Sequence, residues 1–206
     1  CEVVCRFAAI DRDPAGMYRV SPRACEGCAA CYYPCPPGAI RRDPRRAGEW
    51  FYSRTRFGPL YHAALRPGEE NSGKLVNLVR QKGRQHAERE GFDLVLIDGP
   101  PGMGCPVISA LNQADYCLIV TEPSLSGQHA LQRVLDVTRH FRVPAAVFVN
   151  KADLYPPGSE AIVAYCVAED IPVLGRMPFD PMLAKAMNAG EPVTHHAPAA
   201  PSSLAL

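Results

Sequence analysis

Four cysteines near the start of the chain have the spacing of a metal-binding loop. They follow the pattern C-x2-C-x2-C-x3-C with a proline directly after the last: Cys25, Cys28, Cys31, Cys35 and Pro36. In this arrangement three closely spaced thiolates bind one 4Fe-4S cluster, and the fourth binds the other cluster of a pair. Zinc sites more often use two C-x2-C pairs separated by a long loop. The spacing therefore favours iron and sulfur, with zinc and plain structural or disulfide-bonded cysteines as the alternatives.

An internal repeat extends this pattern toward the start of the chain. Cys1 and Cys5 match Cys31 and Cys35, with both pairs offset by the same thirty positions. Fourth ligands exchange between the two clusters of such a pair. We therefore expect one complete cluster on Cys25, Cys28, Cys31 and Cys5. Cys35 and Cys1 would serve a second cluster that is incomplete here, so residues 1–48 are predicted to be a truncated two-cluster ferredoxin module.

Composition narrows the class of protein. The chain has 206 residues and a formal net charge of +1, which removes the electrostatic case for a nucleic-acid or membrane-surface protein. No apolar run approaches the roughly 18 to 20 residues that span a bilayer. Six of the nine cysteines fall within the first 35 positions, which points to a local metal site in a reducing compartment. We therefore expect a cytoplasmic metalloprotein whose true start is missing.

The remainder of the chain alternates strand and helix patterns. Residues 49–65 suggest two short antiparallel strands, and 72–90 a helix. Short apolar runs then predict buried parallel strands at 93–97, 116–120, 145–149 and 172–174. Helical patterns lie near 106–113, 124–141, 158–169 and 181–189. This order predicts an α/β layer over residues 49–193, with Cys105, Cys117 and Cys166 as core residues and 194–206 as a disordered tail.

Polar residues follow three of the predicted strands, where chemistry gathers in parallel sheets. The strand ends read Asp98-Gly-Pro-Pro-Gly102, Thr121-Glu-Pro-Ser124 and Asn150-Lys-Ala-Asp153. An acid that closes an apolar strand is how nucleotide-hydrolysing enzymes hold Mg2+, and a following glycine lets backbone amides approach a terminal phosphate. An Asn-Lys-x-Asp sequence suits edge-on recognition of a nucleotide base. Each motif alone could be only a turn, but their joint order favours a nucleotide site.

With these motifs, the chain resembles the MinD/Mrp-like P-loop ATPases, in particular those with an inserted ferredoxin module. The matching stretches are the cysteine run and residues 67–75, 97–102, 105–106, 120–123, 149–153 and 171–175. The resemblance implies that Asp98 lies near Mg2+, that Gly102 senses the γ-phosphate and that Asn150 contacts the adenine. Base recognition in this family depends more on the asparagine than on Lys151 and Asp153. ATP, Mg2+ and a homodimer closed across the nucleotide face are implied for the full-length protein.

The family's phosphate loop has no counterpart in residues 1–66. The stretch from Gly68 to Lys74 spells G-x4-G-K, but Leu75 follows where Mg2+ needs Ser or Thr, and two glutamates would repel phosphate. We therefore expect this chain alone to bind ATP poorly and hydrolyse little. The favoured function is an ATP switch coupled to electron transfer or cluster transfer, with a redox or iron-sulfur acceptor as partner. The alternatives are a plain electron carrier with an α/β docking domain, or an iron-sulfur assembly carrier.

Overall fold

The computed structural model describes residues 2–44, 46–67, 69 and 73–206, and its contacts divide the chain into two compact units. The first unit ends at Ile97 and the second begins at Asp98. The sequence pattern predicts a boundary after residue 48, whereas the hairpin and helix that follow this position belong to the first unit. Cys1 and most of the glycine-lysine stretch from Gly68 lie outside the described residues.

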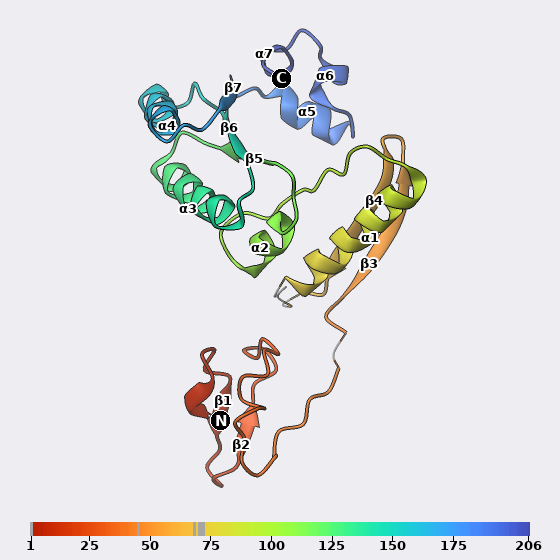
Figure 1. The fold of residues 1–206 in the computed structure, drawn as a ribbon, viewed down its shortest axis with the longest axis vertical. Helices are drawn as coiled ribbons and strands as arrows, with labels where there is room; N and C mark the ends of the chain where they lie inside the picture. The colour runs from red at the N-terminus through yellow and green to blue at the C-terminus, as the bar shows by residue number, and fades with distance from the viewer. Residues whose placement is uncertain (1, 45, 68, 70–72) are drawn as a thin grey trace. The chain divides into compact units, whose positions relative to one another are not determined.

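The cysteine-rich part of the first unit has little regular structure (Figure 1). A short 3-10 helix, Glu2–Val4, precedes the strands β1 (Ile10–Arg12) and β2 (Tyr18–Val20), which pair antiparallel. Asp13 closes the turn between them, because its carboxylate accepts hydrogen bonds from the backbone N–H groups of Ala15 and Met17. The cysteine run follows in turns and extended segments.

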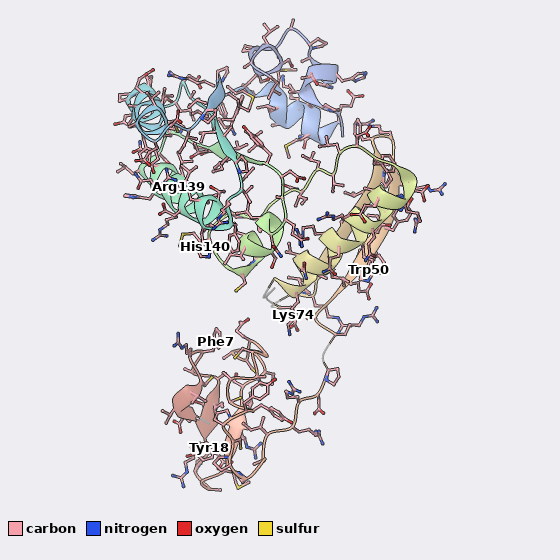
Figure 2. The ribbon with its side chains drawn as sticks, viewed as in Figure 1. Phe7, Tyr18, Trp50, Lys74, Arg139 and His140 are labelled. Atoms are coloured by element: carbon pink, nitrogen blue, oxygen red, sulfur yellow. The ribbon has the colours of Figure 1, made fainter. Side chains whose placement is uncertain are left out.

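A hairpin and a helix make up the rest of the first unit. The strands β3 (Gly48–Thr55) and β4 (Gly58–Leu65) pair antiparallel over their whole length, and α1 (Lys74–Glu90) follows. Trp50 stacks on Tyr61, and Tyr61 meets His86 of the helix at a ring-centroid distance of 5.7 Å. Figure 2 labels Trp50 on β3 and Lys74 at the start of α1. The predicted antiparallel strands and helix are therefore confirmed.

The second unit contains a three-stranded parallel sheet in the order β5-β6-β7 (Figure 1). The strands are β5 (Cys117–Thr121), β6 (Ala145–Asn150) and β7 (Val173–Met177). The helices are α2 (Cys105–Leu111), α3 (Leu125–Phe141), α4 (Pro156–Ala168) and α5 (Met182–Asn188). Leu131, Leu135, Val147, Val149 and Ile162 form the core with Cys166. The predicted α/β layer is confirmed, since each of these elements lies within a few residues of its predicted range.

The predicted strand at 93–97 is wrong for this structure. The segment has no strand assignment, and the side chains of Leu94 and Leu96 are 80% and 91% exposed. An apolar run becomes a strand only when a neighbouring strand supplies its hydrogen bonds. Among the described residues, no strand pairs with this segment, so its apolar side chains stay in solvent.

Two further expectations are corrected. The segment after Val193 is not a disordered tail, because it forms the short helices α6 (Val193–His196) and α7 (Pro201–Leu204), and Ser202 is completely buried. Of the three cysteines expected in the core, Cys166 is buried and Cys117 half-buried, but Cys105 is exposed at the first position of α2. No helix in the described part of the chain is both long and apolar enough to cross a membrane.

Candidate functional site

The parallel sheet brings the loops after β5, β6 and β7 to one edge. Thr121 pairs with Val149, and Asn150 pairs with Met177, so the three strands end almost level with one another. The polar residues that follow these strands therefore come from segments far apart in the sequence and meet at the carboxyl edge of the sheet. This is the edge at which open α/β sheets bind ligands.

An ion pair joins the loop after β5 to the loop after β6. The Nζ of Lys151 lies 2.5 Å from Oε1 of Glu122, and both side chains are partly exposed. Lys151 has a φ of 53°, which places a non-glycine residue in the left-handed region. This backbone bend turns the chain sharply at the end of β6. Glu122 was not among the predicted site residues, although it follows β5 directly.

Hydrogen bonds join the loop after β6 to the loop after β7. The Ala152 N–H donates to the Met177 carbonyl at 2.9 Å, and the Phe179 N–H donates to Oδ1 of Asp153 at 2.6 Å. The Ser159 hydroxyl of α4 donates to the Ala152 carbonyl at 2.7 Å. Asp153 thus already has one carboxylate oxygen in a structural bond, while no described hydrogen bond uses its Oδ2.

Asn150, at the end of β6, has a buried acceptor without a partner. Its Oδ1 has almost no exposed surface and accepts no hydrogen bond from the described residues. A buried polar atom left unpaired typically costs about 1–3 kcal/mol, and such atoms in native proteins call for a physical explanation. An amide oxygen is the acceptor that an exocyclic amino group of a nucleobase requires. The orphaned Oδ1 therefore fits the expected role of Asn150.

The two helices behind this edge approach the loop after β5 very closely. A Cβ at Gly127 of α3 would lie 2.2 Å from the Glu122 carbonyl, and a Cβ at Gly158 of α4 would lie 2.4 Å from the Pro123 carbonyl. Ser124 caps α3, because its hydroxyl accepts a hydrogen bond from the Gly127 N–H at 3.0 Å. Only glycine allows this packing, which fixes the position of Glu122.

Asp98 and Gly102 lie in an exposed loop before α2. Gly102 has a φ of 91°, a conformation that favours glycine. The described contacts link neither residue to Asn150. The structure therefore brings Asn150, Lys151 and Asp153 together at the sheet edge, and it places Asp98 and Gly102 in the same unit without joining them to that edge.

The cysteine loop offers free thiols. Cys25 and Cys28 are exposed, Cys5, Cys31 and Cys35 are half-buried, and none of these five forms a disulfide. The Ala9 N–H donates to the Cys5 sulfur at 3.3 Å. Ala29, between the second and third cysteines of the run, has a φ of 63°, an unfavourable conformation for alanine and one common in ligand-binding loops.

In chemical terms this donor set fits an iron-sulfur cluster, because iron in such clusters takes cysteine thiolates. Within the described residues no three His, Cys, Asp or Glu side chains converge as metal ligands, so the sulfurs are not gathered in the chain alone. Metal binding and local folding are coupled in small metal-binding loops. Cys1, the sixth predicted ligand, lies outside the described residues.

The first unit has a groove between the hairpin and α1. Its lining includes Tyr52, Tyr61, His86 and Phe92, together with Arg54 and Arg89. It contains none of the predicted site residues, and we assign it no part in the proposed chemistry.

Sequence reasoning missed a buried carboxylate just after β7. Asp180 is 7% exposed. It accepts hydrogen bonds from the Met182 N–H at 2.8 Å, the Ser202 N–H at 3.1 Å and the Ser202 hydroxyl at 2.8 Å. The bond from Met182, with those from Ser202, lowers the pKa of Asp180. The available signal was Phe179-Asp180-Pro181, an acid three residues after the end of β7.

This lowered pKa predicts how α7 responds to acid. Because the pKa of Asp180 is lower in the folded state than the ordinary value of about 3.9, its bonds stabilise the docked α7 fully above that value. The stabilisation is lost as the pH falls through the folded pKa. We expect the Ser202 amide resonance to keep its position from pH 7 to about 5 and to shift below about pH 4. In Asp180→Asn this acid shift should be absent, and an equal shift in both proteins would contradict the assignment.

Comparison with known proteins finds relatives of this chain by sequence. No family model matches the chain. An uncharacterized protein of Methanocaldococcus jannaschii is 34% identical over 151 residues, which are 73% of this chain and 51% of that protein. A cytosolic Fe-S cluster assembly factor, the Nubp1 homolog of Drosophila grimshawi, is 27% identical over 124 residues, covering 50% of this chain and 40% of its own length. The chain thus spans about half the length, or less, of these curated relatives.

Solved structures of MinD proteins share the fold. The cell division ATPase MinD of Pyrococcus furiosus aligns with a TM-score of 0.57 at 20% identity, covering 75% of this chain and 65% of that one. The MinD cell division protein of Aquifex aeolicus aligns with a TM-score of 0.52 at 24% identity, covering 69% of this chain and 60% of its own. The expected α/β fold with a parallel sheet is confirmed, while the ferredoxin module stays a prediction. The chain has the fold of the MinD-like P-loop NTPases.

Proposed function

We propose that this chain is part of a nucleotide-dependent iron-sulfur protein of the MinD/Mrp type. An adenine nucleotide with Mg2+ would bind at the carboxyl edge of the sheet, and the cysteine loop would bind a 4Fe-4S cluster. The proposal of a nucleotide site rests on the buried, unpartnered Oδ1 of Asn150 at that edge. The proposal of an iron-sulfur cluster rests on the spacing of the cysteines and on their free thiols.

At the nucleotide edge each residue has a separate role. Asn150 accepts a hydrogen bond from the exocyclic amino group of the base, which relieves its orphaned acceptor. Lys151 and Asp153 flank the base, with Lys151 held by Glu122 and Asp153 held by the Phe179 N–H. In the same unit, Asp98 would hold Mg2+ and the backbone at Gly102 would approach the terminal phosphate.

At the cysteine loop, Cys25, Cys28, Cys31 and Cys5 would hold one complete cluster, and Cys35 and Cys1 would serve a second. When bound, such a cluster accepts and donates single electrons. Similarity to proteins named as cytosolic iron-sulfur assembly factors favours the reading in which the cluster is cargo for an acceptor protein. On that reading the exposed thiols of Cys25 and Cys28 leave one side of the cargo open to the acceptor. Nucleotide binding would close a homodimer across the sheet edge.

Asn150→Ala tests the nucleotide half. We expect the affinity for Mg-ATP to fall about tenfold or more, because one hydrogen bond and its buried acceptor are removed and 1.4 kcal/mol corresponds to a factor of ten. Isothermal titration of the protein as encoded by its gene measures this loss. The matched control is Asn188→Ala, which removes an exposed asparagine at the end of α5. Saturable ATP binding with equal affinity in wild type and Asn150→Ala would overturn the proposed role.

A further inference from the structure

The carboxyl-terminal helix α7 is connected to the nucleotide edge by a continuous set of contacts. We propose that Asp180 and Ser202 are positioning residues for Asp153: α7 holds the loop after β7, and this loop holds the Asp153 carboxylate at the base-binding edge. This inference rests on the proposed nucleotide function. It gives the end of the chain a part in selecting the base, which neither the sequence pattern nor the comparisons assign.

The first contact fixes Asp180 to α7. Its Oδ2 accepts both the N–H and the hydroxyl of Ser202, at 3.1 and 2.8 Å, while its Oδ1 accepts the Met182 N–H at 2.8 Å. Ser202 is completely buried and Asp180 is 7% exposed, so water competes little for these bonds. A carboxylate with both oxygens engaged from two directions has one orientation.

The second contact passes from Asp180 to Asp153. Phe179 precedes Asp180 directly, and its N–H donates to Oδ1 of Asp153 at 2.6 Å. Prolines at 178 and 181 flank these two residues. Because each proline fixes its own φ and restricts the residue before it, the short loop has few conformations. A change in the anchorage of Asp180 therefore moves the Phe179 N–H and, with it, the Asp153 carboxylate.

The consequence concerns the choice of base. With Oδ1 of Asp153 held by Phe179, its Oδ2 faces no described donor, and Oδ1 of Asn150 is also unpartnered. Two hydrogen-bond acceptors at one edge favour a base that presents N–H donors to them. Adenine offers its exocyclic amino group, whereas hypoxanthine offers its ring N1–H in place of an acceptor. The ratio of ATP to ITP affinity therefore depends on how firmly Asp153 is held against one of these groups.

Hydrogen exchange on the intact chain tests the mechanical link without nucleotide. Ser202→Ala removes one bond to Asp180. The matched control is Ser203→Ala, because the Ser203 hydroxyl donates to the Val193 and Ala197 carbonyls in the same segment and not to Asp180. We expect Ser202→Ala to speed exchange at Phe179 and across 150–154, and Ser203→Ala to speed it only within 193–205. Faster exchange confined to 193–205 in both variants would overturn the proposal.

Nucleotide selectivity tests the link to the base. In the full-length gene product, we expect Ser202→Ala and Asp180→Asn to change the ratio of ATP to ITP affinity about three- to tenfold, the usual worth of one hydrogen bond. Ser203→Ala should leave the ratio unchanged. A purely structural role would lower both affinities equally, and that result would refute the positioning role. Failure of the wild type to bind any nucleotide would instead refute the proposed function, while the exchange measurement still decides whether α7 holds Asp153.

Discussion

Cys28→Ser should leave the chain without its iron. A serine hydroxyl is a poor substitute for a thiolate ligand, and Cys28 is the middle one of three closely spaced ligands of the complete cluster. After anaerobic reconstitution, wild type should show a broad visible absorption shoulder and, once reduced, the EPR signal of a 4Fe-4S cluster. In Cys28→Ser both signals should fall to background. Iron and acid-labile sulfide per chain provide the count.

Cys105→Ser is the control for this experiment. Its thiol is also exposed, but it lies at the start of α2, outside the cysteine run. Iron content and spectrum should therefore equal those of wild type. Full iron occupancy in Cys28→Ser, or tetrahedral zinc without iron in wild type, would contradict the predicted ligand set.

Asp98→Asn should abolish Mg2+-dependent ATP hydrolysis and spare the iron. The substitution keeps the size of the side chain and removes the charge that would hold Mg2+. Loss of one group that stabilises charge in the transition state typically costs about 100- to 1,000-fold in turnover. Phosphate release by the full-length gene product measures the loss of turnover, and the visible spectrum is recorded on the same samples.

Asp115→Asn provides the comparison for Asp98. Asp115 is exposed in the same unit and precedes β5, away from the strand ends. Its substitution should change neither turnover nor spectrum. Wild-type turnover in Asp98→Asn would show that another group holds the metal, and a parallel loss of iron would show that the substitution disturbs the fold.

The sequence predicts the second unit well because its signals are local. β5 and β6 are nearly continuous apolar runs and β7 begins with a short one, and each helix that follows repeats its apolar residues at helical spacing. The segment 93–97 has the same local signal. A strand, however, also requires a neighbouring strand to supply its hydrogen bonds, and the apolar run alone does not show whether such a neighbour exists. Leu94 and Leu96 therefore remain exposed where burial was expected.

For the same reason, the sequence predicts only some residues of the candidate site. Asn150, Lys151 and Asp153 are adjacent in sequence, so a strand-end motif finds them together. Ser202 lies 22 residues beyond its partner Asp180. It is in a segment rich in alanine and proline, a composition typical of a disordered segment. Only the tertiary contact reveals its hydrogen bonds to Asp180. The cysteine spacing likewise predicts which thiols bind a cluster, although the chain alone does not gather their sulfurs.

The close approach of α3 and α4 to the loop after β5 limits how this protein can be redesigned. With Gly127 against the Glu122 carbonyl and Gly158 against the Pro123 carbonyl, any larger residue at either position displaces backbone. Displacing Glu122 also moves the partner of Lys151. A library that aims to change base preference can therefore vary the strand-end side chains, but it must keep glycine at two helix positions outside the strand ends.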